Sequence, residues 1–377
     1  MIADTLIGAR MAVERLAQRR WGKQCRVTGY RMLTRRAALV ARIQLDGAPV
    51  ATAIVKHLEA PMELFADILA DHPEFANELL NHRFLARAGL GGALTPELFA
   101  DDPGGMLLFA DLGDADAILP RGFDELIPAL ATALAALHGT TRSLADDYAA
   151  LRMEMELGDA RDDRRKYGLP GMMRLYQAGT ARCLAMEGMG FRTMAALARE
   201  LEQVEQMISD PGEFRALIHD DLSNARQTFD TGDRLALLDW EQAKYGHALL
   251  DFVKPMVGKF EIELETGISA WQCPCFPIAL PHDYRRQLAR DYGMAFDDAE
   301  WNANLSAALI FGSLALIGRM MAWDSRRSLR GSPLQNINGI SRRLAELLAD
   351  NPEFPALRSF LRDYLVSLTN PLGVNGA

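Results

Sequence analysis

The stretch IHDDLSNARQTFDTGDRLALLDWE, residues 218–241, contains two short runs that are typical of β-strands, one on each side of a turn. The runs are RQTFD (226–230) and LALLDW (235–240), and the Thr231-Gly232-Asp233 segment between them favours a turn. Asp221 precedes the first run and Asp239 lies at the end of the second. Because both positions lie at the same end of an antiparallel hairpin, the sequence predicts that the two carboxylates lie close together.

Two neighbouring carboxylates suit the transfer of a phosphoryl group from a nucleotide. One can accept the proton of an attacking hydroxyl group while the other holds a metal ion, because this chemistry depends mainly on positioning and charge neutralisation. Either aspartate alone has a simpler interpretation, as the cap of a turn or as the polar end of a strand. An acid before the first strand of the hairpin together with an acid at the end of the second favours the catalytic interpretation.

The first part of the chain predicts a helix followed by three strands. The helix extends to about Arg20. The three strands are predicted by segments rich in alternating and β-branched residues, namely RVTGYRML (26–33), ALVARIQLDG (38–47) and PVATAIVKHL (49–58). Asp46-Gly47 is typical of a hairpin turn between the last two. We therefore expect a small antiparallel sheet.

A lysine closes one face of the third predicted strand. Thr52, Ile54 and Lys56 share that face by the two-residue period of a strand. The next segment, residues 71–91, predicts a helix with Glu78 in its first turns. In kinases a strand lysine contacts the nucleotide phosphates and a helix glutamate holds that lysine. Taken singly, the lysine is more typical of a strand end and the glutamate of a solvated helix face. As an ordered pair 22 residues apart, they favour the functional interpretation.

The remaining segments predict an α+β fold. Residues 93–114 favour two more strands around a turn at Asp101–Gly105, and a short link follows near Gly113. From there the chain carries mainly helical periodicity, apart from the hairpin described above. We therefore expect a small N-terminal lobe with an antiparallel sheet that binds nucleotide (1–113) and a larger, mainly helical lobe for catalysis and acceptor binding (114–377).

Composition restricts the partners of the chain. Its 377 residues are 49% apolar and 24% charged, and its net charge is -9. Residues 1–113 hold 13 basic and 13 acidic side chains, so the whole net charge lies C-terminal to them. A nucleic-acid partner would need a basic face, which the sequence does not predict. Acidic character in the second part instead favours a cationic or neutral small molecule, such as an amine-bearing acceptor.

Three further features restrict the location and the chemistry. Asp4 and Glu14 interrupt what would have to be the apolar core of a secretory signal. The uncharged run 301–318 contains Asn and Ser and predicts a buried helix rather than a membrane span. Spacing typical of a zinc or redox site does not occur among the four cysteines, Cys25, Cys183, Cys273 and Cys275. We therefore expect a cytoplasmic protein without a membrane partner.

Five segments in order resemble the aminoglycoside phosphotransferase and choline kinase group, whose fold is protein-kinase-like and two-lobed. The resemblance covers about residues 25–260. It rests on AIVK (53–56), NELLNHRFLARAG (77–89), MLLFADLGD (106–114), HDDLSNAR (219–226) and LLDWE (237–241). It implies a small-molecule kinase that uses ATP, or GTP, with Mg²⁺ and phosphorylates a hydroxyl group of an amino sugar, amino alcohol or aminoglycoside-like acceptor.

The resemblance also implies the role of each site residue. Asp221 would be the catalytic base, and His219 a structural member of the catalytic loop. Asp239 would bind magnesium, and Lys56 would contact phosphate with Glu78 as its partner. The hinge that receives the adenine edge would consist of Phe109, Ala110, Asp111 and Leu112.

The catalytic loop departs from the family pattern at one position. Arg226 stands where the family has a metal-binding Asn, and a guanidinium group cannot ligate a metal. Asn224, two residues earlier, would serve only if the loop had a different shape. A nucleotide-binding pseudokinase that has lost transfer is therefore the alternative to an active kinase. A scaffold without a nucleotide site would not explain Lys56 or the paired aspartates.

Overall fold

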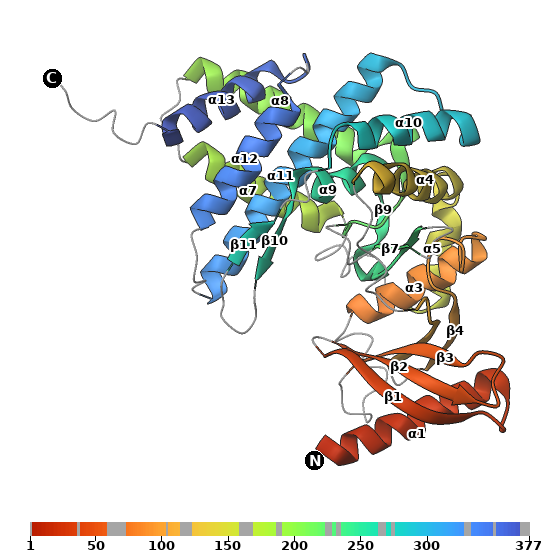
Figure 1. The fold of residues 1–377 in the computed structure, drawn as a ribbon. Helices are drawn as coiled ribbons and strands as arrows, with labels where there is room; N and C mark the ends of the chain where they lie inside the picture. Colours follow the sequence, from red (N-terminus) through yellow and green to blue (C-terminus); the bar gives the residue numbers. More distant parts are fainter. Residues whose placement is uncertain are drawn as a thin grey trace. The chain divides into compact units, whose positions relative to one another are not determined.

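The computed structural model describes most of the chain in two compact units (Figure 1). The described residues are 2–35, 38–58, 73–102, 105–113, 123–157, 169–185, 191–222, 228–230, 235–262, 269–272, 276–327, 333–349 and 352–369. The first unit comprises Met1–Arg121, Asp146–Asp159 and Ala225–Ala243, and the second comprises Gly122–Ala145, Ala160–Asn224 and Lys244–Ala377. Two segments from later in the chain thus join the unit that begins at the N-terminus.

The first unit is built on a five-stranded antiparallel sheet in the order β1-β2-β3-β5-β4. Its elements are α1 (Ile2–Trp21), β1 (Arg26–Arg35), β2 (Ala38–Asp46), β3 (Thr52–Leu58), α3 (Pro73–Arg87), β4 (Leu98–Asp102), β5 (Met106–Ala110), α5 (Ala145–Glu154), β7 (Thr228–Asp230), β8 (Leu235–Leu237) and η3 (Trp240–Gln242). The predicted N-terminal helix, the five predicted strands and the predicted second helix are confirmed. The turn after Asp46 is longer than predicted, because β3 begins only at Thr52.

Helices cover both faces of this sheet. Alternate residues of β5 belong to different apolar clusters: Leu108 packs in the cluster that includes Leu16 of α1, whereas Leu107 packs with Leu79 of α3. The two-residue period of a strand explains this division. The same period places Val55 in the cluster of α1 and its neighbour Ile54 in the cluster of α3. Lys56, which shares a face with Ile54, is therefore directed toward the α3 side of the sheet.

The hairpin predicted within residues 226–240 is a short antiparallel pair of strands. Strands β7 and β8 pair antiparallel, with Thr228 opposite Leu237 and Asp230 opposite Leu235. Residues 231–234, the predicted turn, lie outside the described residues. Asp239 does not end the second strand as predicted; it follows β8 by two residues and adopts a left-handed backbone conformation, with φ of 61°.

The second unit is mainly helical. Its elements are α4 (Phe123–Thr141), α7 (Leu169–Ala185), α8 (Phe191–Ser209), η2 (Gly212–Phe214), β6 (Arg215–Ile218), β9 (Lys244–His247), η4 (Ala248–Phe252), α9 (Val253–Val257), β10 (Lys259–Ile262), β11 (Ser269–Gln272), α10 (Ala279–Tyr292), α11 (Asp298–Arg327), α12 (Pro333–Leu347) and α13 (Pro355–Thr369). Two small sheets, β6-β9 and β10-β11, were not predicted. Their strands have four residues each, which is too short for a clear alternating pattern.

Helix α11 is the central helix of this unit. Its apolar segment Asp298–Met320 is long and apolar enough to cross a membrane, but 83% of that window is buried inside the protein. Helix α7 packs along α11 at two glycines. A Cβ atom on Gly179 would overlap the carbonyl oxygen of Leu314, and a Cβ atom on Gly318 would overlap that of Leu175. The close approach of the two helices therefore depends on small residues at the crossing.

We expect Gly318→Ala to destabilise the protein, because the added methyl group meets backbone atoms that cannot move independently of helix α7. The expected loss is about 1 to 3 kcal/mol of unfolding free energy, typical of overpacking. Chemical denaturation measures this loss. Ala181→Ser, which adds one atom on the exposed side of α7, is the control and should change stability by less than about 0.5 kcal/mol. Equal stability of the two variants would contradict the close packing.

Candidate active site

A buried ion pair joins the strand lysine to the helix glutamate. The Nζ atom of Lys56 lies 2.6 Å from Oε2 of Glu78. The Glu78 side chain is 3% exposed and the Lys56 side chain 12% exposed. The pair forms because β3 directs Lys56 toward α3, and Glu78 lies one turn after the start of that helix. Breaking such a pair would leave an uncompensated buried charge, so it fixes the position of the lysine ammonium group.

Two more carboxylates lie around the same ammonium group. Oδ1 of Asp239 is 3.4 Å from Nζ of Lys56, and Oε2 of Glu241 is 3.5 Å from it. Burial by itself lowers the pKa of Lys56, but the negative charges of Glu78, Asp239 and Glu241 outweigh burial and raise the pKa above its usual range. Lys56 is therefore a permanent cation at physiological pH. Glu241 was not predicted as a site residue, although its place in the quoted LLDWE segment was a signal.

Side chains of α3 hold the backbone that carries these two acids. Asn77 Nδ2 donates to the carbonyl oxygens of Glu241 and Ala243, at 2.8 and 2.9 Å. Asn81 Nδ2 donates to the carbonyl oxygens of Trp240 and Ala243, at 2.9 and 3.2 Å. Both asparagines are buried, and these hydrogen bonds satisfy their amide groups where water is absent. The helix that carries Glu78 thus also positions the segment that follows Asp239.

The charges of this cluster fit a divalent cation held together with phosphate. One ammonium and three carboxylate groups leave a local excess of negative charge, and the Asp239 side chain is 47% exposed. Within the described residues, however, groups of three or more Asp, Glu, His or Cys side chains arranged to hold a metal are absent. Mg²⁺ in phosphoryl transfer commonly takes only one or two protein carboxylates, and substrate phosphates and water supply the other ligands. The chemistry of the residues therefore fits magnesium bound with a nucleotide.

The predicted hinge residues lie at the end of β5 and just after it. Phe109 is buried, and its ring lies 4.6 Å from that of His82 between centroids. The backbone N–H of Ala110 donates to the carbonyl of Glu97 at 2.9 Å. The Asp111 carboxylate pairs with Arg42, with Oδ2 2.6 Å from Nε.

Leu112 completes this segment and packs against Ala236 of β8. The side chains of Phe109, Asp111 and Leu112 therefore all make contacts within the first unit.

In the second unit, one carboxylate organises the loop that contains Asp221. Asp251 Oδ2 accepts the backbone N–H of His219 at 2.9 Å, and its Oδ1 accepts that of Asp220 at 2.7 Å. His138 Nε2 lies 3.0 Å from the same Oδ2. Asp220 has φ of 58°, an unusual conformation for a residue other than glycine. Asp251 was missed in the sequence, although a lone acid within the apolar run ALLDFV was a signal.

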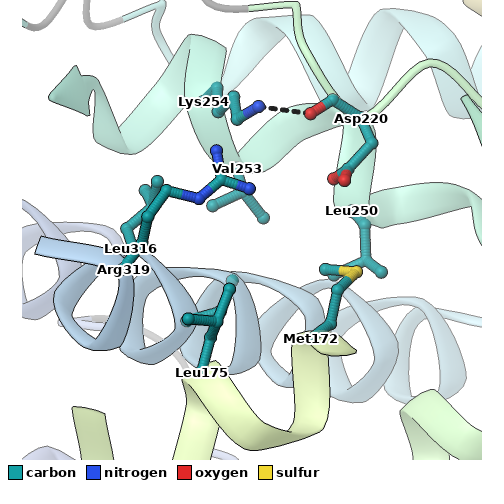
Figure 2. A pocket seen from close by; sticks show the side chains of 10 residues that line it. Met172, Leu175, Asp220, Leu250, Val253, Lys254, Leu316 and Arg319 are labelled. Atoms are coloured by element: carbon teal, nitrogen blue, oxygen red, sulfur yellow. Dashed lines mark hydrogen bonds between the residues drawn. The ribbon is translucent and has the colours of Figure 1, made fainter. Parts of the chain in front are cut away.

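Lysines contact both aspartates of this loop. Lys254 Nζ lies 2.7 Å from Oδ1 of Asp221 and also donates to the carbonyl oxygen of Asp220 (Figure 2). Lys244 pairs with the carboxylate of Asp220. Burial by itself raises the pKa of Asp220, but the positive charges of Lys244, Lys254 and Arg319 outweigh burial and lower it. Sequence reasoning identified none of these three cations.

The described residues place the other predicted loop members only in part. His219 is fully buried, and its Nδ1 atom accepts the backbone N–H of Asp221 at 3.3 Å. Asn224 and Arg226 lie outside the described residues. Asp221 belongs to the second unit and Asp239 to the first. That their carboxylates meet therefore stays a prediction.

Comparison with known proteins identifies related families. Residues 36–303 match the profile of the phosphotransferase enzyme family, APH, over more than half of the chain. Among curated protein sequences, none matches this chain.

Solved structures share the fold. An ethanolamine kinase from Plasmodium vivax has a TM-score of 0.51 at 10% identity and covers 94% of this chain and 88% of its own. A choline kinase from Cryptosporidium parvum has a TM-score of 0.50 at 9% identity, and the match covers 89% of this chain and 93% of the choline kinase. A choline/ethanolamine kinase family protein from Mesorhizobium loti has a TM-score of 0.47 at 16% identity and covers 96% and 100%. At identities this low, the two structures with TM-scores of 0.50 and 0.51 show the fold alone, and the predicted fold class is confirmed.

We expect Asp251→Asn to loosen the loop that carries Asp221, because one oxygen that faces a backbone N–H becomes an amide donor or must turn away. The expected cost is about 1 to 3 kcal/mol for buried groups left unsatisfied. Denaturation measures the stability, and hydrogen exchange at residues 219–221 measures the local opening. Asp210→Asn, on an exposed aspartate, is the control. Unchanged exchange in Asp251→Asn would show that Asp251 does not hold the loop.

Proposed function

The chain belongs to the phosphotransferase enzyme family, and we propose that it transfers the γ-phosphoryl group of ATP to a hydroxyl group of a small molecule. The observation that carries this proposal is the buried Lys56–Glu78 ion pair with Asp239 beside it. A fixed ammonium group next to an exposed carboxylate supplies both a phosphate contact and a metal ligand. A purely structural ion pair would not need the additional carboxylates of Asp239 and Glu241.

In the proposed complex, Lys56 binds the α- and β-phosphates of the nucleotide. Glu78 keeps the ammonium group in place, so little side-chain entropy is lost when the phosphates bind. Asp239 would hold Mg²⁺, with Asn224 as a second candidate ligand, and the ion supplies charge neutralisation on the phosphates when bound. Arg226 would place a further positive charge on the loop, so that it replaces part of the role of a second metal ion.

Asp221 is the proposed catalytic base. The acceptor hydroxyl gives its proton to the Asp221 carboxylate while its oxygen bonds to the γ-phosphorus. The bond between that phosphorus and the bridging oxygen breaks, and ADP leaves. Lys254 contacts Oδ1 of Asp221 and so fixes the orientation of the carboxylate. Asp251 and His219 act indirectly, because they hold the backbone on which Asp221 is carried.

The adenine base would contact the backbone of the hinge, residues 109–112. Because the N–H of Ala110 already donates to Glu97, the contacts would come from backbone groups of Asp111 and Leu112. The same groups would serve guanine if the nucleotide were GTP. We propose that the protein acts in the cytoplasm on a freely diffusing acceptor, with neither nucleic acid nor membrane as a partner.

We expect Asp221→Asn to bind ATP with nearly the parental affinity and to lose most phosphoryl transfer. Asn fills the same space but cannot accept the hydroxyl proton, and loss of a general base typically costs about a hundred- to ten-thousand-fold in kcat. Calorimetry measures the binding and ADP release measures the turnover, with Asp210→Asn as the matched control. Parental turnover in Asp221→Asn would reject Asp221 as the base.

A further inference from the structure

A small cavity in the second unit adjoins the proposed base (Figure 2). One part of its wall is apolar, formed by side chains of α7, η4, α9 and α11: Met172, Leu175, Leu250, Val253 and Leu316. The other part is charged, formed by Asp220, Lys254 and Arg319. Figure 2 shows the Arg319 guanidinium group and the Asp220 carboxylate directed toward the same space, while the Lys254 ammonium group points to the carbonyl oxygen of Asp220. Lys254 links the cavity to the chemistry, because its ammonium group also contacts Asp221.

The charge in the cavity wall is not balanced. The Asp220 carboxylate is already paired with Lys244, and Lys254 is paired with Asp221. Arg319 is only partly exposed, and its charge acts on Asp220. Within the described residues, however, its guanidinium group has no direct ion pair, because the Asp220 carboxylate pairs with Lys244. Withdrawing a guanidinium group from water without a direct ion-pair partner is unfavourable. The site therefore has the capacity to bind an additional anion.

The shape and size of the cavity restrict that anion. A guanidinium group presents parallel N–H donors that match the two oxygens of a carboxylate or phosphate. The cavity volume is about 30 Å³, and on the same measure one water molecule needs roughly 10 to 15 Å³. There is thus room for the oxygens of one such group and little more. The hydroxyl-bearing part of a ligand must lie outside the cavity.

We propose that this cavity holds the anionic group of the phosphoryl acceptor, a hydroxy compound that carries a carboxylate or a phosphate, with Arg319 as its anchor. This inference rests on the proposed function, because it takes Asp221 as the base and uses Lys254 to connect it to the cavity. It also replaces the expectation of an amine-bearing acceptor that the overall acidic composition suggested. An ammonium group in this cavity would face Lys254 and Arg319, and like charges at close range repel.

The test uses a set of four-carbon alcohols that differ only in their other end: hydroxybutyrate, butanediol monophosphate, neutral butanediol and cationic aminobutanol. Thermal unfolding of the full chain without nucleotide measures their binding. Comparison of the carboxylate compound with the phosphate compound shows which of these two anionic groups the cavity binds. We expect one or both anions, but not the other compounds, to stabilise the protein.

Variants assign the binding to Arg319. Arg319→Met keeps the side-chain length without charge and should weaken binding of the anions by roughly tenfold or more, as loss of a charge-assisted contact implies. Arg319→Lys keeps the positive charge and should retain part of the affinity. It replaces Arg319→Met as the test if the methionine variant does not fold. Arg182→Met, on an exposed arginine of α7, is the control and should bind as the parent does. In turnover, Arg319→Met should raise KM for the anionic alcohol with kcat nearly unchanged.

Other results would overturn the inference. Stabilisation by neither anion, or equal binding by the parent and both Arg319 variants, would exclude an anion site at Arg319. A loss of ATP affinity in Arg319→Met would assign the guanidinium group to the nucleotide phosphates instead. Failure of the proposed function is distinguishable: binding of the anions that depends on Arg319, without ADP release from any alcohol, would keep the site and reject the transfer. Turnover of aminobutanol alone would keep the transfer and reject the anionic acceptor.

Discussion

The proposed chemistry depends on the hydrogen bonds that the buried carboxylate of Asp251 accepts from the catalytic loop. This carboxylate accepts two consecutive backbone N–H groups, from His219 and Asp220, and it also contacts His138. This arrangement holds Asp220 in a left-handed conformation that would otherwise be unfavourable. The direction in which the chain presents Asp221 follows from that conformation. A residue that touches no substrate in the proposed mechanism thus determines where the proposed base lies.

In the first unit, helix α3 positions the proposed site residues. Glu78 fixes the Lys56 ammonium group, while Asn77 and Asn81 hold the backbone of the segment that follows Asp239. The proposed phosphate contact and the proposed metal ligand are thereby positioned by the same rigid element. Charge-neutralising groups must be preorganised to stabilise a transition state, since reorientation during the reaction would cost free energy. The two units therefore each present a group that is already oriented before substrates bind.

Local signals in the sequence were sufficient for the helices and strands of the first unit, but not for long-range contacts between side chains and backbone. Pro73 and the two-residue alternation around Lys56 predicted helix α3 and strand β3, because caps and periodicity act over a few residues. The hydrogen bonds of Asp251 span about thirty residues of sequence, and spacing does not encode such contacts. The same holds for Arg319 on α11, whose importance arises only from the cavity wall that it shares with Lys254. The acidic composition, which is averaged over the chain, favours an amine-bearing acceptor, whereas the local cations of the cavity wall are the basis of the proposed anionic one.

Transfer of a labelled phosphoryl group is the direct test of the proposed kinase activity. The protein is incubated with a mixture of small hydroxy compounds and ATP that carries heavy oxygen in its γ-phosphoryl group, and mass spectrometry follows each compound. We expect at least one alcohol to gain a single labelled phosphoryl group in step with ADP formation. Bound ATP without any labelled alcohol, across acidic, neutral and amine-bearing compounds, would contradict a phosphotransferase and favour a nucleotide-binding pseudokinase.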